Sequence, residues 1–317
     1  GNIIAVSDPT AHGNIPEVIN GGPYRRVYVY EFNGISWVQK GATLESPDGR
    51  FGEVIELSGN GEFLSVSDPE AGVNDYGNVT TYNYSSSVNQ WTSVTSFTNA
   101  NGYWGYRFGY AISMNYEGDI IAIANPFVNQ LVGEVRVYNN GYGGGSLIDV
   151  LSTGGSYPSG SDGFGASVSL NSEGDRIAIG AIWNANSYEG PGYVKVFEKQ
   201  SSPNWLQFGQ TIVGDSLYDK LGYSVSLDSS GSVLAVSSNK NSYWASIYPN
   251  YVKVLQEENG NWNQIGSDIY GGLSTTFGSS VKLSGDASKL IVGGGTNIYS
   301  ISTVCSGCTD STALNYD

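Results

Sequence analysis

Short segments in which bulky apolar residues alternate with small ones recur along the whole chain. In one of them, Ile121 and Ile123 alternate with Ala122 and Ala124. Because side chains two residues apart lie on the same face of a β-strand, this period predicts a strand with one bulky face and one small face. Few positions are charged, so we expect both faces to be buried between neighbouring sheets. Six such segments are present, at residues 3–7, 63–67, 120–124, 176–180, 233–237 and 289–293.

Three further strands accompany this segment in a typical repeat. A first strand opens on an aromatic-Gly or Leu-Gly pair, a third reads Val-x-Val-Tyr as in Val135–Tyr138, and a fourth starts near a Trp. The opening pairs begin at Phe51, Phe108, Phe164, Leu221 and Phe277, which are 57, 56, 57 and 56 residues apart. The tryptophans at the starts of the fourth strands are Trp37, Trp91, Trp205 and Trp262. A fixed period of this length indicates an array of like supersecondary units.

A four-residue turn is predicted between the first and second strands of each repeat. It ends in Gly at 61, 118, 174 and 231, and Gly tolerates the positive φ that tight hairpins demand. The last repeat has Ala287 at this position. We therefore expect a different or strained turn there.

These patterns predict an all-β protein, a β-propeller with four-stranded antiparallel blades of about 57 residues. We count 22 strands, with three in the first and last units and four in each of the others. This count favours six blades, with seven blades as the alternative. A parallel β-helix is the structural rival, but its coils are much shorter. The predicted domains are a propeller at residues 1–304 and a segment at 305–317 that begins a C-terminal module or linker.

Composition and charge point to a protein outside the cell. Charged residues are only 14% of the 317 residues, the net charge is −15, and Gly (44) and Tyr (23) are abundant. An acidic surface repels phosphate and anionic lipid, which argues against nucleic acid and membrane insertion. We expect an extracellular or cell-surface location. The expected partners are other extracellular proteins or copies of the chain itself, with glycans as a further class.

The Phe-Gly pairs together with Gly133–Tyr138 resemble the FG-GAP repeat, which builds the propeller at the head of integrin α chains. The resemblance spans about residues 1–301 and implies the propeller fold in a secreted protein. Members of that family often bind Ca²⁺ in a D-x-D-x-D-G turn. The corresponding turns of this chain lack this series of three aspartates, as in Asp228–Gly231, which has one. We therefore expect no cofactor, with Ca²⁺ as the alternative.

The segment Gly307–Asp317 resembles the start of a Cys- and Asx-rich module of secreted proteins, of the form GCTDxxALNYD. The usual second half of that module is missing, which favours a longer parent polypeptide. Cys305 and Cys308 are the only cysteines. They are disulfide candidates for each other, or Cys308 pairs with a partner outside this sequence.

Few residues offer catalytic chemistry. His12 is the only histidine and no nucleophile motif is present, so no catalytic residue, metal ligand or enzyme activity is expected. Paired carboxylates remain open at Asp68/Glu70 and Asp215/Asp219, although we expect solvated loop acids.

Two sequons, at Asn78 and Asn83, are candidate glycosylation sites. Asn-Trp pairs at Trp205 and Trp262 could stack on sugars, but a repeated packing position is the favoured interpretation.

We therefore expect an extracellular, non-enzymatic propeller that serves adhesion or is a structural subunit of a surface assembly or filament. A carbohydrate-binding propeller is the alternative, and a polysaccharide-active enzyme is third. Binding is expected in long loops between the second and third strands. These loops are residues 8–24, 68–77, 183–192 and 239–250.

Overall fold

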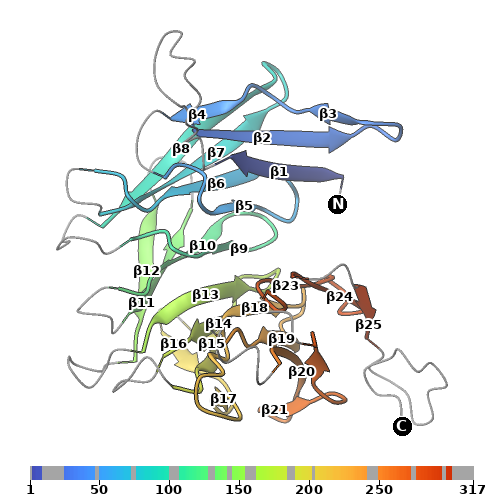
Figure 1. The fold of residues 1–317 in the computed structure, drawn as a ribbon. Coiled ribbons are helices and arrows are strands. Elements are labelled where there is room, and N and C mark those ends of the chain that lie inside the picture. The colour runs from blue at the N-terminus through green and yellow to red at the C-terminus, as the bar shows by residue number, and fades with distance from the viewer. Residues whose placement is uncertain are drawn as a thin grey trace, which may run out of the picture. The chain divides into compact units, whose positions relative to one another are not determined.

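A computed structural model gives the fold of the chain (Figure 1). The structure describes residues 2–8, 25–46, 50–72, 76–99, 107–127, 133–140, 145–153, 162–183, 190–201, 204–240, 249–272, 276–294 and 298–301. Over these ranges the chain is all-β and forms six small antiparallel sheets in sequence order. The protein is a six-bladed β-propeller, which confirms the predicted fold class.

Each blade is built from consecutive strands. Blade 1 holds β1 (Ile3–Asp8), β2 (Arg25–Phe32), β3 (Trp37–Gln39) and β4 (Leu44–Ser46). Blade 2 holds β5 (Ile55–Leu57), β6 (Phe63–Asp68), β7 (Asn78–Ser85) and β8 (Gln90–Thr98). Blade 3 holds β9 (Ile112–Met114), β10 (Ile120–Asn125), β11 (Glu134–Asn139) and β12 (Ser146–Leu151).

The remaining blades follow the same order. Blade 4 holds β13 (Phe164–Leu170), β14 (Arg176–Ala181), β15 (Tyr193–Lys199), β16 (Trp205–Gln207) and β17 (Ile212–Val213). Blade 5 holds β18 (Ser224–Leu227), β19 (Val233–Ser237), β20 (Tyr251–Glu258), β21 (Asn261–Gln264) and β22 (Ile269–Tyr270). Blade 6 holds β23 (Val281–Leu283), β24 (Lys289–Val292) and β25 (Ile298–Ser300).

The fourth strand is interrupted in three blades. In blades 1, 4 and 5 two short segments pair with the same third strand, for example β16 and β17 with β15. Counting each interrupted pair as one strand reduces the 25 strands described to the 22 predicted. The chain also gathers into two compact units. The first is Gly1–Val128 with Arg136–Val150, and the second is Asn129–Val135 with Leu151–Asp317.

Bulky residues of one blade pack against the third strand of the blade before it. Leu64 and Val66 on β6 join one buried cluster with Val27 and Val29 on β2. Leu234 and Val236 on β19 do the same with Val194 and Val196 on β15. We call the side that carries these second-strand residues the front face of a blade. The alternation read from the sequence is therefore an alternation between a front face and a back face.

Small residues on the back face allow the next blade to come close. A Cβ added to Gly109 would lie 3.1 Å from the Ser67 Cβ on β6. A Cβ added to Gly77, just before β7, would lie about 2.2 Å from the carbonyl oxygen of Phe108. The Phe-Gly pair of blade 3 thus packs directly against the backbone of blade 2. This close approach is the physical reason for the repeated glycines.

Serines of the first strands link neighbouring blades by hydrogen bonds. The Ser169 hydroxyl on β13 accepts the backbone N–H of Leu227 on β18 at 3.0 Å. The Ser224 and Ser226 hydroxyls on β18 accept the N–H groups of Val281 and Leu283 on β23, both at 3.0 Å. The outer edge of each first strand has no neighbouring strand in its own sheet. These hydrogen bonds therefore satisfy backbone N–H groups at that edge.

The turn that ends in Ala287 is strained, as predicted. Ala287 has φ of 56° and donates its N–H to the Ser284 carbonyl at 2.9 Å. The Gly231 N–H makes the equivalent bond to the Asp228 carbonyl at 3.1 Å, with φ of 73°. The turn is therefore of the same kind, and only the residue in the left-handed conformation differs.

Candidate functional site

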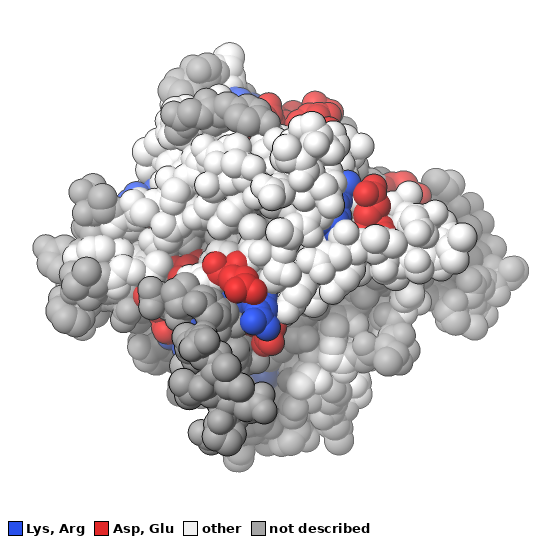
Figure 2. All heavy atoms as spheres, turned by 90° about the horizontal axis from the view of Figure 1, so that it is seen from above, with Lys and Arg blue, Asp and Glu red and all other residues white. Residues whose placement is uncertain are grey.

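Charged side chains are sparse and gather in small groups on the face seen in Figure 2, where uncharged atoms dominate the surface. None of the described residues forms a helix long and apolar enough to cross a bilayer. Among the described residues, no group of three or more His, Cys, Asp and Glu side chains is arranged to hold a metal ion. The candidate sites therefore come from individual polar clusters and from exposed apolar surface.

The two sequon asparagines lie on β7 and are partly exposed. The Asn78 side-chain amide donates to the Ser96 hydroxyl at 3.1 Å, and the Asn83 amide donates to the Glu62 carbonyl at 3.2 Å. Both amide groups would have to leave these partners to carry a glycan. Glycosylation at these positions stays a prediction.

Several predicted features lie outside the described residues. Cys305, Cys308 and His12 are among them, so their pairing and roles stay predictions. Part of each long loop that we expect to bind partners is also outside, at 9–24, 73–75, 184–189 and 241–248.

Acids in the first turns of the blades bind their own backbone. Asp228 accepts the N–H groups of Ser232 and Val233 at 2.8 and 2.7 Å. Asp286 accepts the Ser284 hydroxyl at 2.6 Å and the Ser288 N–H at 3.0 Å. These bonds, with the Ser284 hydroxyl contributing most, lower the pKa of Asp286 to about 2. Both carboxylates are thus engaged in shaping the turns.

The first predicted carboxylate pair is only partly solvated. Asp68 is buried and accepts the Arg50 N–H at 2.5 Å, so the expectation of a solvated loop acid was wrong for this residue. Burial raises the pKa of Asp68. Glu70 is partly exposed and pairs with Arg50 at 2.7 Å and with Arg107 at 3.6 Å. The pair fixes the Arg50 segment to the end of β6.

The second predicted pair contains the most buried acid among the residues that the structure describes. Asp219 is 1% exposed, because it lies just before the Leu221–Gly222 pair that packs on blade 4. Its carboxylate contacts the Lys240 Nζ at 3.0 Å and accepts the Tyr251 hydroxyl at 2.7 Å. The solvated-loop interpretation was wrong for Asp219, because a fully buried carboxylate must be paired, whereas the Asp215 side chain is 56% exposed, as expected of a loop acid.

Two further acids lie around the same tyrosine. The Lys253 Nζ contacts Asp215 at 2.9 Å and Asp268 at 3.1 Å. Burial lowers the pKa of Lys253, but hydrogen bonds and charge from the two acids outweigh it and leave the pKa above its ordinary value. Burial also raises the pKa of Tyr251, and the hydrogen bond to Asp219 adds to that rise. Asp219, Lys240 and Tyr251 are all buried and in contact, and the buried Lys253 lies over the Tyr251 ring with its Nζ 5.1 Å from the ring centroid.

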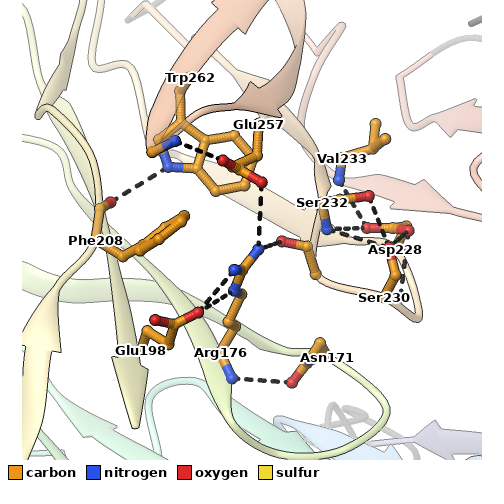
Figure 3. Close-up of polar contacts among 12 residues, drawn as sticks. Asn171, Arg176, Glu198, Phe208, Asp228, Ser230, Ser232, Val233, Glu257 and Trp262 are labelled. Atoms are coloured by element: carbon orange, nitrogen blue, oxygen red, sulfur yellow. Dashed lines mark hydrogen bonds and ion pairs between the residues drawn. The ribbon is translucent and has the colours of Figure 1, made fainter. Parts of the chain in front are cut away.

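A second polar cluster joins blades 4 and 5 (Figure 3). Arg176 on β14 pairs with Glu198 at 2.7 Å and donates to the Gly231 carbonyl of blade 5 at 3.1 Å. Its guanidinium lies 4.2 Å from the ring centroid of Phe208. The Trp262 indole N–H donates to the Phe208 carbonyl at 3.3 Å. This cluster is a junction between blades 4 and 5, in which Arg176 and Phe208 of blade 4 contact Gly231 and Trp262 of blade 5.

The repeated tryptophans are therefore packing residues, as the favoured interpretation held. Trp91, Trp205 and Trp262 are 7%, 5% and 2% exposed, so their rings are not available to stack on a sugar. The Trp91 indole donates to the Lys40 carbonyl of blade 1 at 2.8 Å, the same bond that Trp262 makes in blade 5. Trp37 is the exception, with 46% of its surface exposed.

The front face of blade 1 carries exposed apolar side chains. Ile4 and Val6 on β1 are 40% and 48% exposed. The equivalent pairs of the other five blades are each at most 1% exposed. They are Leu64/Val66, Ile121/Ile123, Ile177/Ile179, Leu234/Val236 and Leu290/Val292. Only in blade 1 do these residues meet solvent.

Aromatic residues continue this face across the sheet. Ile4 pairs with Tyr30 and Val6 with Tyr28, and Phe32 pairs with Trp37, so all six side chains lie on one side. The ring centroids of Tyr28 and Tyr30 lie 6.4 Å apart in a stacked arrangement, and the ring centroids of Phe32 and Trp37 lie 5.4 Å apart. An exposed Arg26–Glu45 ion pair of 3.1 Å borders the face. The sequence analysis missed this surface, although Ile4, Val6 and Trp37 were assigned to their strands.

The back face of blade 6 also carries exposed aliphatic side chains. Ile291 and Ile298 pair across β24 and β25 and are 53% and 67% exposed. Lys282 pairs with Ile291 on β23, and both Lys282 and Lys289 are exposed on this side. At the position of Ile291 the other blades carry Ala or Ser, so this aliphatic side chain is specific to the last blade.

No known protein family matches the sequence, and no curated protein matches it. Solved structures with a similar fold include a functionally unknown protein from Desulfotomaculum acetoxidans, with TM-score 0.56, 10% identity, 88% of this chain and 73% of that chain covered. A protein from Lactobacillus plantarum is similar with TM-score 0.51 and 12% identity, covering 78% of this chain and 67% of that one. The periplasmic gluconolactonase of Pseudomonas aeruginosa is similar with TM-score 0.50 and 13% identity, covering 95% and 92%.

These likenesses support the fold and correct one expectation. The prediction that the chain is not an enzyme was wrong, because a structure of this fold with similar length is named a gluconolactonase. The absence of a familiar catalytic motif in the sequence is no ground for excluding catalysis on a propeller. The resemblance to FG-GAP repeats and to the Cys- and Asx-rich module stays a prediction.

Proposed function

We propose that this protein is an extracellular propeller that serves adhesion or is a structural subunit of a surface assembly or filament. It associates through the uncovered faces of its first and last blades. The observation that carries this proposal is the 40% and 48% exposure of Ile4 and Val6, where all equivalent residues are buried. Contiguous exposed apolar surface in a soluble protein marks an interaction site.

The chemistry of the two faces favours association between copies. A front face and a back face are the two halves of the contact that neighbouring blades make inside the chain, as between blades 1 and 2. In one copy the front face of blade 1 is aromatic and aliphatic with Glu45 at its border. The back face of blade 6 offers Ile291 and Ile298 beside Lys282 and Lys289. Two different faces that fit each other associate head to tail, which generates closed rings or open chains of molecules.

Sedimentation velocity of paired variants tests the proposal. Val6→Glu breaks the front face and Ile291→Glu breaks the back face, so each variant alone should be a monomer at concentrations where the unchanged protein associates. An equimolar mixture should form a dimer, because one intact face of each kind remains. Val213→Glu, at an equally exposed valine of blade 4, is the matched control and should associate normally. A monomeric unchanged protein, or association that survives both variants, would count against the proposal.

Carbohydrate binding is a second candidate, favoured by the same aromatic stripe. Tyr28, Tyr30 and Trp37 place their rings on one side of the sheet, and aromatic rings of this kind stack on sugar rings. A glycan array with the unchanged protein and Trp37→Ala would distinguish it from self-association. Binding that Trp37→Ala removes would support it, and an empty array would remove it.

Catalysis is a third candidate, favoured by the buried Asp219–Lys240–Tyr251 cluster and by the gluconolactonase among the similar structures. Buried ionisable groups in contact are typical of functional sites as well as of ion-pair networks that only stabilise the fold. Hydrolysis of a sugar lactone, followed by acid release, would test it. Activity that Tyr251→Phe lowers and the exposed control Tyr223→Phe leaves unchanged would support a site at this cluster, whereas no release above the uncatalysed rate would reject it.

A further inference from the structure

A lysine and an aspartate at the two ends of one hairpin are buried against each other in blade 5. The hairpin is β18–β19, with Ser224 paired to Ser237 at its open end. Asp219 precedes β18 and is 1% exposed, and Lys240 follows β19 and is 7% exposed. The Lys240 Nζ lies 3.0 Å from Oδ1 of Asp219. An amine and a carboxyl group are therefore held in contact with little access to water.

The two oxygens of the Asp219 carboxyl group differ in their partners. Oδ2 accepts the Tyr251 hydroxyl at 2.7 Å and the Ser216 N–H at 2.8 Å. Oδ1 accepts no hydrogen bond from the described residues, because the Lys240 Nζ approaches it outside hydrogen-bonding geometry. In an ordinary ion pair the ammonium group donates to such an oxygen. One oxygen is thus fixed by two donors, and the other has only its contact with the amine.

The amine is also positioned by groups other than the carboxylate. Its Nζ donates to the Pro249 carbonyl at 3.1 Å and lies 5.1 Å from the centroid of the Tyr251 ring. The Lys240 backbone N–H donates to the Asn250 side chain at 2.8 Å, which fixes the start of the lysine side chain. The Nζ therefore has one acceptor that is independent of Asp219.

We propose that Lys240 and Asp219 are joined by an intramolecular amide bond in the folded protein. The Nζ attacks the Asp219 carboxyl carbon, the bond from that carbon to Oδ1 breaks, and Oδ1 leaves as water with two of the three ammonium protons. The reaction consumes no other reactant. Groups held about 3–3.5 Å apart in a fixed orientation react with the high effective concentration of an intramolecular reaction.

The surroundings favour both the reaction and its product. The Tyr251 hydroxyl and the Ser216 N–H lie at distances from Oδ2 that stabilise the negative oxygen of a tetrahedral intermediate. In the product the same two donors bind the amide oxygen, and the remaining hydrogen on Nζ still has the Pro249 carbonyl as its acceptor. Two buried charges become one uncharged amide with paired polar atoms, which removes the cost of burying an ion pair.

Blade 4 contains the same arrangement without the amine, which makes it a natural control. Asp162 and Tyr193 are joined by a hydrogen bond of 2.5 Å at positions equivalent to the aspartate and tyrosine of blade 5. At the position of Lys240 the sequence has Trp183. The tyrosine–aspartate pair is thus common to both blades, and the lysine that can react with it is specific to blade 5.

The bond closes the β18–β19 hairpin into a covalent ring. It goes beyond the proposed function, because a blade closed in this way resists unfolding whether or not copies of the protein associate. It also excludes a catalytic role for Asp219, since an amide leaves no free carboxylate at this residue. Association, lactone hydrolysis and the bond are therefore measured by separate experiments.

The intact mass of the denatured, unglycosylated protein tests the inference directly. We expect it to be lower than the mass of the sequence by one water molecule. Trypsin should not cleave after Lys240 and should instead give a branched product that joins residues 200–220 to residues 221–253. The full sequence mass with normal cleavage after Lys240 would show an ion pair only and overturn the inference, as would a water loss mapped to another position.

Matched variants test the assigned roles. Tyr251→Phe removes one of the two donors to Oδ2 and should slow bond formation roughly 100-fold, so that freshly prepared protein contains both masses. Tyr193→Phe, the matching change in blade 4, should leave the reaction complete. Lys240→Met should have the full mass of its own sequence and a lower Tm than the unchanged protein. Equally fast bond formation in Tyr251→Phe and Tyr193→Phe would overturn the role of the Tyr251 hydroxyl.

Discussion

Buried tyrosine–aspartate pairs recur at one position in two consecutive blades. Tyr193 opens β15 and donates to Asp162 at 2.5 Å, and Tyr251 opens β20 and donates to Asp219 at 2.7 Å. Each acid lies two residues before the pair that starts a blade, Phe164–Gly165 or Leu221–Gly222. Burial raises the pKa of Asp162. The tyrosine hydroxyl therefore stabilises a carboxylate that the interior disfavours, and it fixes the start of one blade's first strand to a third strand.

Replacing Tyr193 with Phe should destabilise the protein by about 1–3 kcal/mol at pH 7, because the buried Asp162 carboxylate loses a donor. The raised pKa of Asp162 means that the native state binds this proton more tightly than the unfolded state does. Its contribution to stability is therefore present in acid and is lost as the pH rises through that pKa. Without Tyr193 the pKa rises further, so the deficit should grow from acid to neutral pH. Urea unfolding at both pH values, with Tyr223→Phe as the exposed control, measures it.

Ala287→Gly should stabilise the protein by about 1 kcal/mol, because the left-handed backbone of a non-glycine residue is relieved. The gain is limited by the loss of the buried Ala287 methyl, which is 4% exposed. Thermal unfolding should show a higher Tm. The reverse change at the equivalent turn, Gly174→Ala, should lower it, and an unchanged Tm in both variants would contradict the strain argument.

At the scale of strands and blades, close backbone approach decides the architecture. The sequence pattern predicts which residues form the second strands, because their alternation is strict and uninterrupted. It does not predict why Gly77 precedes a third strand, since that reason is the Phe108 carbonyl of another blade. It also does not predict the interrupted fourth strands, because their pairing depends on the third strand rather than on their own short apolar runs.

Two glycines of one loop distinguish the cost of a side chain at positive φ from the cost of a side chain in the contact between blades. Gly72 and Gly77 have φ of 90° and 81°, but a Cβ on Gly72 would meet nothing within 4 Å, whereas one on Gly77 would meet the Phe108 backbone. Gly72→Ala should cost about 1 kcal/mol. Gly77→Ala should cost about 1–3 kcal/mol more, because the added methyl overpacks the contact between blades. Equal losses in urea unfolding would show that the contact adjusts freely.

For the whole molecule, low charge and uncovered blade faces have to be considered together. The sequence predicts the net charge of −15 and the propeller, but exposed apolar surface arises only once the array of blades has been assembled. Ile4 and Val6 follow the same pattern as ten buried residues, so no local signal marks them as different. The buried state of Asp219 was missed for the same reason, because its loop is polar in sequence and its burial comes from the adjoining strands.

Association should increase as the pH approaches the isoelectric point of about 4.3, because mutual repulsion between copies with net charge −15 falls. Light scattering between pH 7 and pH 5 at constant salt should show this rise in the unchanged protein. Val6→Glu should show a smaller rise, because the front face no longer contributes. An identical pH response in both would place the attraction elsewhere on the surface.

The near identity of successive first strands also affects how the chain reaches its fold. β13 and β18 share the core Ser-Val-Ser-Leu and pair with β14 and β19 in the same register, Leu170 with Ile177 and Leu227 with Leu234. During refolding, β14 therefore meets two strands that fit it almost equally well, one of them from the wrong repeat or from another molecule. Slipped and domain-swapped species are characteristic errors of such repetitive chains. Slow, concentration-dependent recovery from denaturant follows from the same repetition that builds the propeller.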